Sequence, residues 1–253
     1  MKNILTLLTL LISITFYGQT AVIVLGSVHE PTKFVNADTI FNIFKQVQPD
    51  IILLEADTTL YSLIKTNLDE NEINAVRKYL EFKPQTILKA VDYVGRQEFY
   101  KSNRSFELKD SLNKTLGNLI SSNKLDSNSL QILQTYSDFD ELCSTLSKQP
   151  LRIVNSELAY QLTEKYQTYT YEKLQEIIDK ALELKKYSSY YKRESKFWFD
   201  RNKAIAVNSL NFIQQYKPKK AIIITGFFHK TFVLKELNDR QKDYNITIKE
   251  YWE

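Results

Sequence analysis

Two apolar runs at opposite ends of the chain share one pattern, and they constrain the fold more than any other feature. Residues 21–29 read AVIVLGSVH and residues 221–229 read AIIITGFFH, so each run leads into Gly, two further residues and His. Continuous runs rich in β-branched residues are typical of strands buried on both faces of a parallel sheet. A third run, residues 50–55, follows an expected helix that Asn36 caps and Pro49 ends. Strand, helix and strand in this order predict a βαβ unit.

The middle of the chain is expected to be mostly helical. From Leu60 to about Pro150 the pattern predicts helices and no strand, and Ile87, Leu88, Val91 and Val94 are placed on one of these helices. A brief strand is expected at 151–154, an amphipathic helix near 174–182, a long helix from 188 to 216, and an edge strand at 246–248. The predicted class is therefore α/β, with a split, mainly parallel sheet built from the N- and C-terminal parts and a large helical insertion at about 60–150.

The N-terminus has the form of a secretory signal peptide. Lys2 precedes an apolar run at 4–14, and a polar region follows at 17–19. The apolar run is shorter than the roughly 20 residues that a membrane span needs. We predict a signal peptide at 1–18 with cleavage near Gly18, a single α/β domain at 19–253, an exported protein that is periplasmic or secreted, and no stable membrane span after cleavage.

Composition and motifs exclude several functions. The net charge of +4 is too small and too evenly spread to predict a nucleic-acid partner. A single cysteine, Cys143, excludes an internal disulfide and a zinc site built from cysteines. The sequence also lacks G-x-S-x-G, Walker A, G-x-G-x-x-G and H-E-x-x-H motifs.

The two histidines of the chain, His29 and His229, occupy equivalent positions after two predicted strands. Ligands of parallel α/β sheets bind beyond the carboxyl ends of the strands, where loops converge. Glycine there, at Gly26 and Gly226, allows a sharp turn and leaves room for a ligand. Histidine can bind a metal or move protons near neutral pH. The plainer alternative is two unrelated histidines at strand ends.

Two charged residues are further candidates for the same site. Glu55 ends the second predicted strand, where it could be a metal ligand, a general base, a solvated charge or a helix cap. Arg201 lies on an apolar face of the long helix with Trp198 and Ile205, so its guanidinium needs a carboxylate, a phosphate or an anionic intermediate as partner. A structural salt bridge is the simpler alternative for Arg201.

With these residues in view, the chain resembles the TraB/GumN family and the related Tiki metalloproteases, and more distantly the erythromycin-esterase and ChaN haem-binding group. The resemblance rests on Gly26 with His29, on Glu55, on Arg201-Asn202, and on Gly226 with His229. It covers about residues 21–57 and 197–237. The chain departs from the pattern after His229, where Lys230-Thr231-Phe232 replaces Leu-x-Gly, and at Phe227 and Phe228, which replace small residues.

The resemblance implies an exported metal-dependent hydrolase, possibly a peptidase, acting on a peptide or small-molecule substrate. His29, Glu55 and His229 would hold a divalent metal (Mn, Co or Zn) or act as bases. Arg201 would orient the substrate or stabilise an oxyanion, and Gly26, Asn202 and Gly226 would contact substrate. One alternative is a non-catalytic haem- or metal-binding protein that uses the same histidines. Another is a degenerate family member that acts only through protein contacts.

Overall fold

The computed structural model describes residues 18–57, 59–65 and 70–253, so the predicted signal peptide lies almost wholly outside the described residues. The elements in chain order are β1 (Thr20–Ser27), α1 (Ala37–Val47), β2 (Ile51–Leu54), α2 (Leu60–Leu63), α3 (Asn71–Phe82), β3 (Ile87–Ala90), α4 (Arg96–Ser102), α5 (Ser105–Ser121), α6 (Ser127–Ser147), α7 (Leu151–Val154), α8 (Glu157–Thr168), a π-helix (Tyr169–Lys173), α9 (Leu174–Lys180), a 3₁₀ turn (Lys185–Tyr187), α10 (Ser188–Tyr216), β4 (Lys220–Gly226), α11 (Phe227–Asn238) and β5 (Ile246–Lys249).

The five described strands form one parallel sheet in the order β3-β2-β4-β1-β5, which confirms the predicted α/β class. The strands with the repeated pattern, β1 and β4, lie side by side with Gly26 opposite Thr225. Their side chains alternate between two cores: Ile23 and Leu25 face one side of the sheet, and Val22 and Val24 face the other. Burial on both faces is the reason that these runs are apolar throughout.

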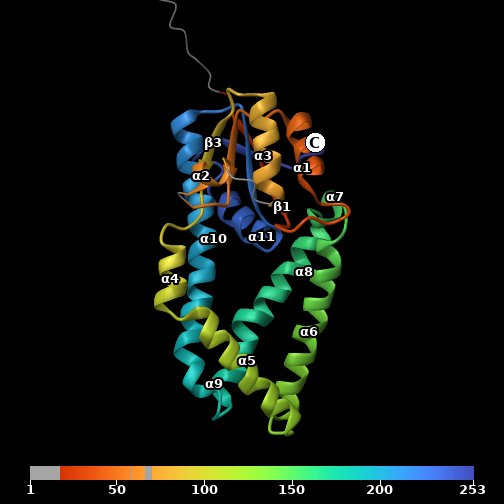
Figure 1. Ribbon diagram of the computed structural model, residues 1–253, viewed down its shortest axis with the longest axis vertical. Helices are drawn as coiled ribbons and strands as arrows, with labels where there is room; N and C mark the ends of the chain where they lie inside the picture. The colour runs from red at the N-terminus through yellow and green to blue at the C-terminus, as the bar shows by residue number, and fades with distance from the viewer. Residues whose placement is uncertain (1–17, 58, 66–69) are drawn as a thin grey trace, which may run out of the picture.

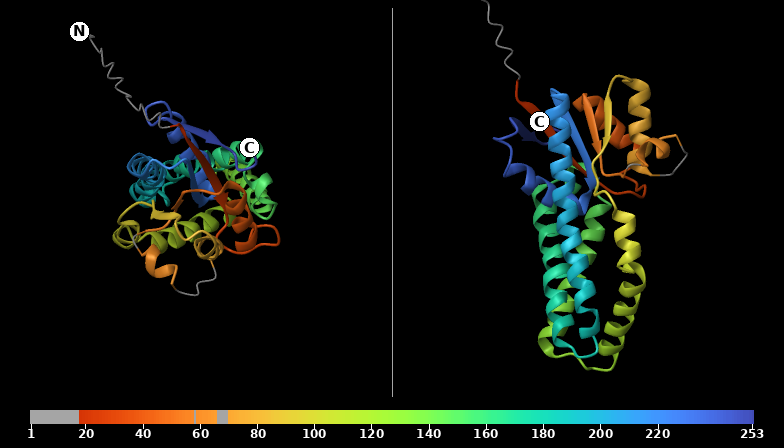
Figure 2. Two further views of the ribbon diagram at one scale, coloured as in Figure 1. Left: turned by 90° about the horizontal axis from the view of Figure 1, so that it is seen from above. Right: turned by 90° about the vertical axis from the view of Figure 1, so that its left-hand side faces the viewer.

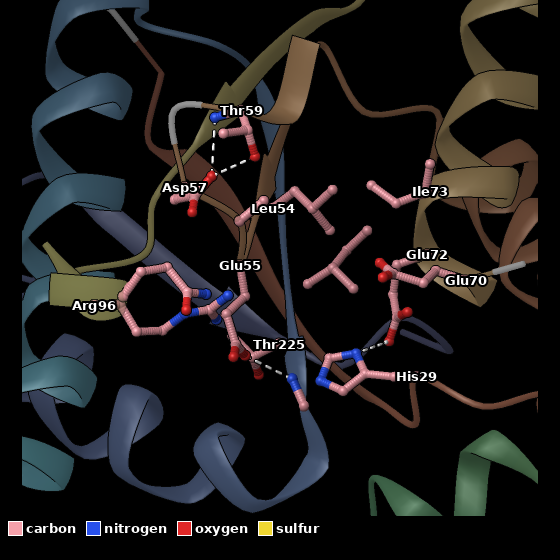
Figure 3. Close-up of a pocket in the computed structure, with 14 residues that line it drawn as sticks. His29, Leu54, Glu55, Asp57, Thr59, Glu70, Glu72, Ile73, Arg96 and Thr225 are labelled. Atoms are coloured by element: carbon pink, nitrogen blue, oxygen red, sulfur yellow. Dashed lines mark hydrogen bonds and ion pairs between the residues drawn. The ribbon is translucent and has the colours of Figure 1, made fainter. Parts of the chain in front are cut away.

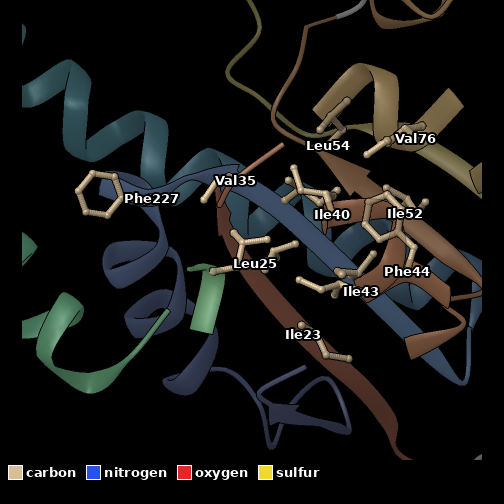
Figure 4. Packing of buried hydrophobic residues seen from close by; sticks show 14 of the residues in the cluster. Ile23, Leu25, Val35, Ile40, Ile43, Phe44, Ile52, Leu54, Val76 and Phe227 are labelled. Atoms are coloured by element: carbon tan, nitrogen blue, oxygen red, sulfur yellow. The ribbon is translucent and has the colours of Figure 1, made fainter. Parts of the chain in front are cut away.

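Helices cover both faces of the sheet (Figures 1 and 2). On one face α1 packs through Ile40 and Phe44, as Figure 4 shows. Asn36 caps α1 by accepting hydrogen bonds from the backbone N–H groups of Asp38 and Thr39, as the sequence predicts. On the other face α10 packs through Ile205 and Leu210, beside α11. The predicted bounds of α10, 188 to 216, are confirmed.

A group of helices forms an elongated body that projects from one edge of the sheet (Figure 1). This body comprises α5, α6, α8, α9 and the first half of α10. It has a hydrophobic core of its own around Leu112, Ile177 and Tyr190. Among the described residues, no helix is both long and apolar enough to cross a membrane.

Two local predictions are wrong. Residues 87–90 are not helical but form the edge strand β3 on β2, and Val94 is an exposed loop residue. A strand of four residues is too short for periodicity to separate it from a helical turn. Residues 151–154 form a helical turn instead of a strand. Pro150 precedes the turn, and the buried residues Leu151 and Val154 lie three positions apart, which is helical spacing. The inserted helices consequently begin only after β3 and continue into α10, rather than spanning about 60–150.

Candidate active site

Four elements bring the predicted site residues together at the carboxyl edge of the sheet. His29 follows β1, Glu55 follows β2, Arg201 lies on α10, and His229 lies in the first turn of α11. The strand order puts β4 between β1 and β2, so the second Gly-x-x-His segment lies between His29 and Glu55. A Cβ atom placed on Gly226 would lie 3.6 Å from His29 Nε2, 3.6 Å from His229 Cδ2 and 3.8 Å from Glu55 Oε2.

A pocket of about 440 Å³ opens in front of these residues (Figure 3). His29 and Glu55 line it together with Gly226; Arg96 lies beside Glu55, and Glu70 and Glu72 lie beside His29 (Figure 3). His229 and Arg201 are not part of this lining. A ligand in the pocket can therefore reach His29 and Glu55 directly.

Glu55 is held at both carboxylate oxygens. Its Oε1 accepts a hydrogen bond from Arg201 Nη2 at 2.5 Å, and its Oε2 accepts one from the Gly226 N–H at 2.7 Å. The carboxylate is 3% exposed although it borders the pocket. These two donors fix its orientation and leave each oxygen with capacity to accept one more hydrogen bond.

Arg201 is the centre of a buried charge cluster. Its Nε donates to Asp92 Oδ1 at 2.7 Å, and its Nη2 donates to Asp92 Oδ2 at 2.9 Å and to Glu55. Burial disfavours the guanidinium, but these carboxylates outweigh it and raise the pKa of Arg201 above its ordinary value. The inward-facing arginine thus has the carboxylate partners that its position requires, and it positions Glu55.

The two histidines differ sharply in environment. His29 lies in a loop, its side chain is 62% exposed, and its Nδ1 lies 3.3 Å from Glu72 Oε1. The contact with Glu72 raises the pKa of His29 to about 9, against the opposing effect of burial. His229 is buried, and burial lowers its pKa to about 4. The contact with Glu72 therefore favours the charged form of His29, whereas burial favours the neutral form of His229.

His229 is fixed on three sides by α10. Its Nδ1 contacts Asn202 Oδ1 at 2.8 Å, its Nε2 faces Arg201 Nη1 at 3.2 Å, and its ring stacks on Trp198 with centroids 4.1 Å apart. Trp198 lies on the same helix face as Arg201 and Asn202, because they follow it by three and four residues. Asn202, predicted to contact substrate, contacts the His229 ring in this structure.

Gly26, a second of the three predicted substrate contacts, lies where two elements pack closely. A Cβ atom there would lie 3.2 Å from Phe227 Cα and 3.3 Å from Asn155 Oδ1. Asn155 also bonds both backbone groups of Gly26, accepting from its N–H at 2.7 Å and donating to its carbonyl at 2.9 Å. The close approach of α11 to β1 therefore requires glycine at this position.

Three residues of the site were not predicted from the sequence. Asp92 follows β3, so it stands at a strand end just as Glu55 does, and the helical prediction for 87–94 hid that signal. Glu72 and Asn71 begin α3, and Asn71 donates to the Val28 carbonyl at 2.9 Å, which anchors the loop that carries His29. No pattern in the sequence marks these two.

The predicted metal ligands have suitable chemistry but do not fit a metal ion in this arrangement. His229 Nε2 and Glu55 Oε1 lie 3.5 Å apart, a separation that two ligands of one ion could have, but Arg201 contacts both atoms. Within the described ranges, no group of three or more His, Cys, Asp and Glu side chains is arranged to hold a metal. A dication between these atoms would require Arg201 to move.

Comparisons of the chain with models of protein families, with curated proteins and with solved structures found no significant match.

Proposed function

We propose that this protein is an exported hydrolase that cleaves an ester or amide bond in the pocket between His29 and Glu55. The observation that carries the proposal is the approach of a fixed carboxylate and an imidazolium to the same point, Gly226, at the edge of a 440 Å³ pocket. Pairs of titratable groups whose environments favour opposite protonation states are typical of acid–base sites. The resemblance to the TraB/GumN and Tiki proteins, which remains a hypothesis, implies the same class of reaction.

Glu55 is the proposed general base. Its carboxylate can accept a proton from a water molecule in the pocket while that water attacks the substrate carbonyl carbon. Arg201 and the Gly226 N–H hold the carboxylate in place, so the base is oriented before substrate arrives.

His29 is the proposed acid. Glu72 engages Nδ1, so the Nε2–H that faces Gly226 remains available to the substrate. It can donate a hydrogen bond to the carbonyl oxygen as negative charge develops, and then a proton to the leaving group. The proton taken by Glu55 passes to solvent, and His29 regains one from solvent.

Arg201, Asn202 and His229 are positioning residues in this proposal. Arg201 joins Glu55 to Asp92, and neutral His229 contacts Arg201 and stacks on Trp198. The divalent metal predicted at His29, Glu55 and His229 stays a prediction, as does the haem alternative.

The proposal is tested with 4-nitrophenyl acetate and fluorescein-labelled casein as probes. Glu55→Gln and His29→Gln should each lower turnover at least about 100-fold, as loss of an acid or base does. Glu70→Gln removes the same charge from the pocket wall and should change turnover less than threefold. Wild-type protein without turnover above buffer, or full activity in Glu55→Gln, would contradict the proposal.

The same preparations separate the alternatives. Turnover that appears only with added Mn²⁺, Co²⁺ or Zn²⁺, together with bound metal lost in a His29→Ala/His229→Ala protein, would favour the metal-dependent reading. A Soret band that depends on either histidine would favour the haem-binding alternative.

A further inference from the structure

The helical body contains a second cavity that the proposed chemistry does not use. Its volume is about 300 Å³, and it lies among α5, α8, the π-helix, α9 and α10. Leu112, Leu174 and Ile177 supply aliphatic walls, and Tyr171, Tyr191 and Trp198 supply aromatic ones. Cavities of about 150 Å³ with apolar walls can hold benzene, so this one has room for a group of two fused rings.

The cavity and the candidate active site border the same groove. This groove has a volume of about 460 Å³, and its lining includes Trp198 and Phe228 of the cavity and His29 and Gly226 of the catalytic pocket. Trp198 also stacks on His229. A ligand that places a polar, reactive end beside Glu55 could therefore extend an apolar end past Trp198 into the cavity.

Two polar atoms at the cavity have no hydrogen-bond partner among the described residues. Gln167, which is 4% exposed, has an unpartnered Oε1 acceptor, and Trp198 has an unpartnered Nε1 donor. Buried polar side chains nearly always have a partner, so each such group requires an explanation.

The backbone at the cavity is also unusual. Thr170 and Tyr171 lie on the π-helix between α8 and α9, and both line the cavity. Short π-helical turns are rare and occur frequently at functional sites. The Tyr191 hydroxyl donates to the Thr170 carbonyl, which ties this turn to α10.

We propose that this cavity is a binding subsite for a hydrophobic ring or branched acyl group of the substrate. The part of this inference that concerns substrate rests on the proposed hydrolase function: the substrate is then an ester or amide with a bulky apolar group on one side of the carbonyl. Binding of the apolar group alone does not depend on catalysis.

The test uses the fluorescent probe N-phenyl-1-naphthylamine, whose emission rises in apolar surroundings, with protein that spans residues 19–253. Wild-type protein should bind the probe at one saturable site. Leu174→Trp, which fills the cavity from its wall, should weaken binding at least tenfold. Leu182→Trp is the matched control, because Leu182 is 83% exposed and outside the cavity lining; its affinity should equal that of wild type.

Equal affinity in Leu174→Trp and wild type, or absence of saturable binding, would overturn the subsite. If Leu174→Trp does not fold, Leu116→Phe replaces it, because Leu116 also lines the cavity and a larger ring there takes up part of its volume. This variant should weaken binding at least threefold, and an unchanged affinity would then be the contrary result.

Glu55→Gln and His29→Gln should bind the probe as wild type does. If the probe binds as expected but the protein hydrolyses no ester or amide, the hydrolase proposal is refuted and the subsite proposal stands. If the protein hydrolyses substrate but Leu174→Trp does not weaken probe binding, the subsite proposal is refuted and the hydrolase proposal stands.

Discussion

Replacement of Asp92 by asparagine tests the charge cluster that positions Glu55. The Asp92 side chain is fully buried, and it accepts two hydrogen bonds from Arg201 and one from Arg96 Nη1 at 2.7 Å. In the native cluster two arginines face the carboxylates of Asp92 and Glu55, so the charges balance. Asp92→Asn keeps the shape of the side chain but leaves Arg201 and Arg96 with Glu55 as the one carboxylate of the cluster, so one positive charge is in excess.

The expected cost of Asp92→Asn is large. Breaking a buried ion pair by removal of one partner destabilises a protein by about 3–5 kcal/mol. For a domain of this size, that corresponds to a fall in melting temperature of roughly 6–20 °C. Arg201→Met should cost a similar amount, because it leaves Glu55 without its guanidinium while Asp92 keeps its contact with Arg96.

Asp200→Asn provides the control on the same helix. Asp200 pairs with Lys196 on the surface, and its side chain is 45% exposed. Such pairs contribute about 0.5 kcal/mol or less. The two variants are compared by urea unfolding followed by circular dichroism. A difference of less than about 1 kcal/mol between them would refute the reasoning that Asp92 neutralises a buried guanidinium.

Three further predictions follow from the site. Gly26→Ala should destabilise the fold by about 1–3 kcal/mol, because the added methyl group meets the Phe227 backbone. Gly226→Ala should leave the free energy of unfolding unchanged but lower turnover, because its methyl group narrows the pocket. Equal melting temperatures for the two variants would contradict this prediction. Burial lowers the pKa of His229 to about 4, so as the pH falls from about 6.5 to about 4 this histidine takes up a proton in the unfolded chain but not in the folded one. Up to about 3 kcal/mol of folding stability is therefore lost between these pH values. A His229→Gln variant should lack this loss when urea unfolding is compared at pH 7 and pH 4.5. Burial raises the pKa of the Cys143 thiol to about 12, so iodoacetamide at pH 8 should label Cys143 only after unfolding, and rapid labelling of the native protein would be the contrary result.

The parts of the fold that could be predicted are those where burial acts along a whole element. β1 and β4 are apolar throughout because both faces of each strand are covered, and α10 has 29 residues of helical pattern ended by Lys217 and Pro218. β3 could not be recognised, since four residues at a sheet edge have no periodicity of their own. That miss also concealed Asp92, although an acid after a strand is the same signal that pointed to Glu55.

The membership of the site could be predicted better than the roles of its residues. His29, Glu55, Arg201 and His229 converge, yet the sequence pattern treats the two histidines as equivalent. They differ because β1 ends in a loop at Val28, whereas β4 continues directly into α11 and turns His229 inward. Glu72, which sets the protonation of His29, comes from a distant helix that no local pattern connects to it.

Nuclear magnetic resonance titration of the two histidines tests the central claim most directly, because the chain contains only these two. Protein labelled at histidine and purified without a histidine tag would be followed from pH 3.5 to 10, with His29→Gln used to assign the signals. We expect the His29 ring to titrate with a pKa near 9 and the His229 ring to stay neutral down to about pH 4. Two rings that both titrate near pH 6.5 would contradict this expectation, because the Glu72 contact would then not raise the pKa of His29 and burial would not lower the pKa of His229.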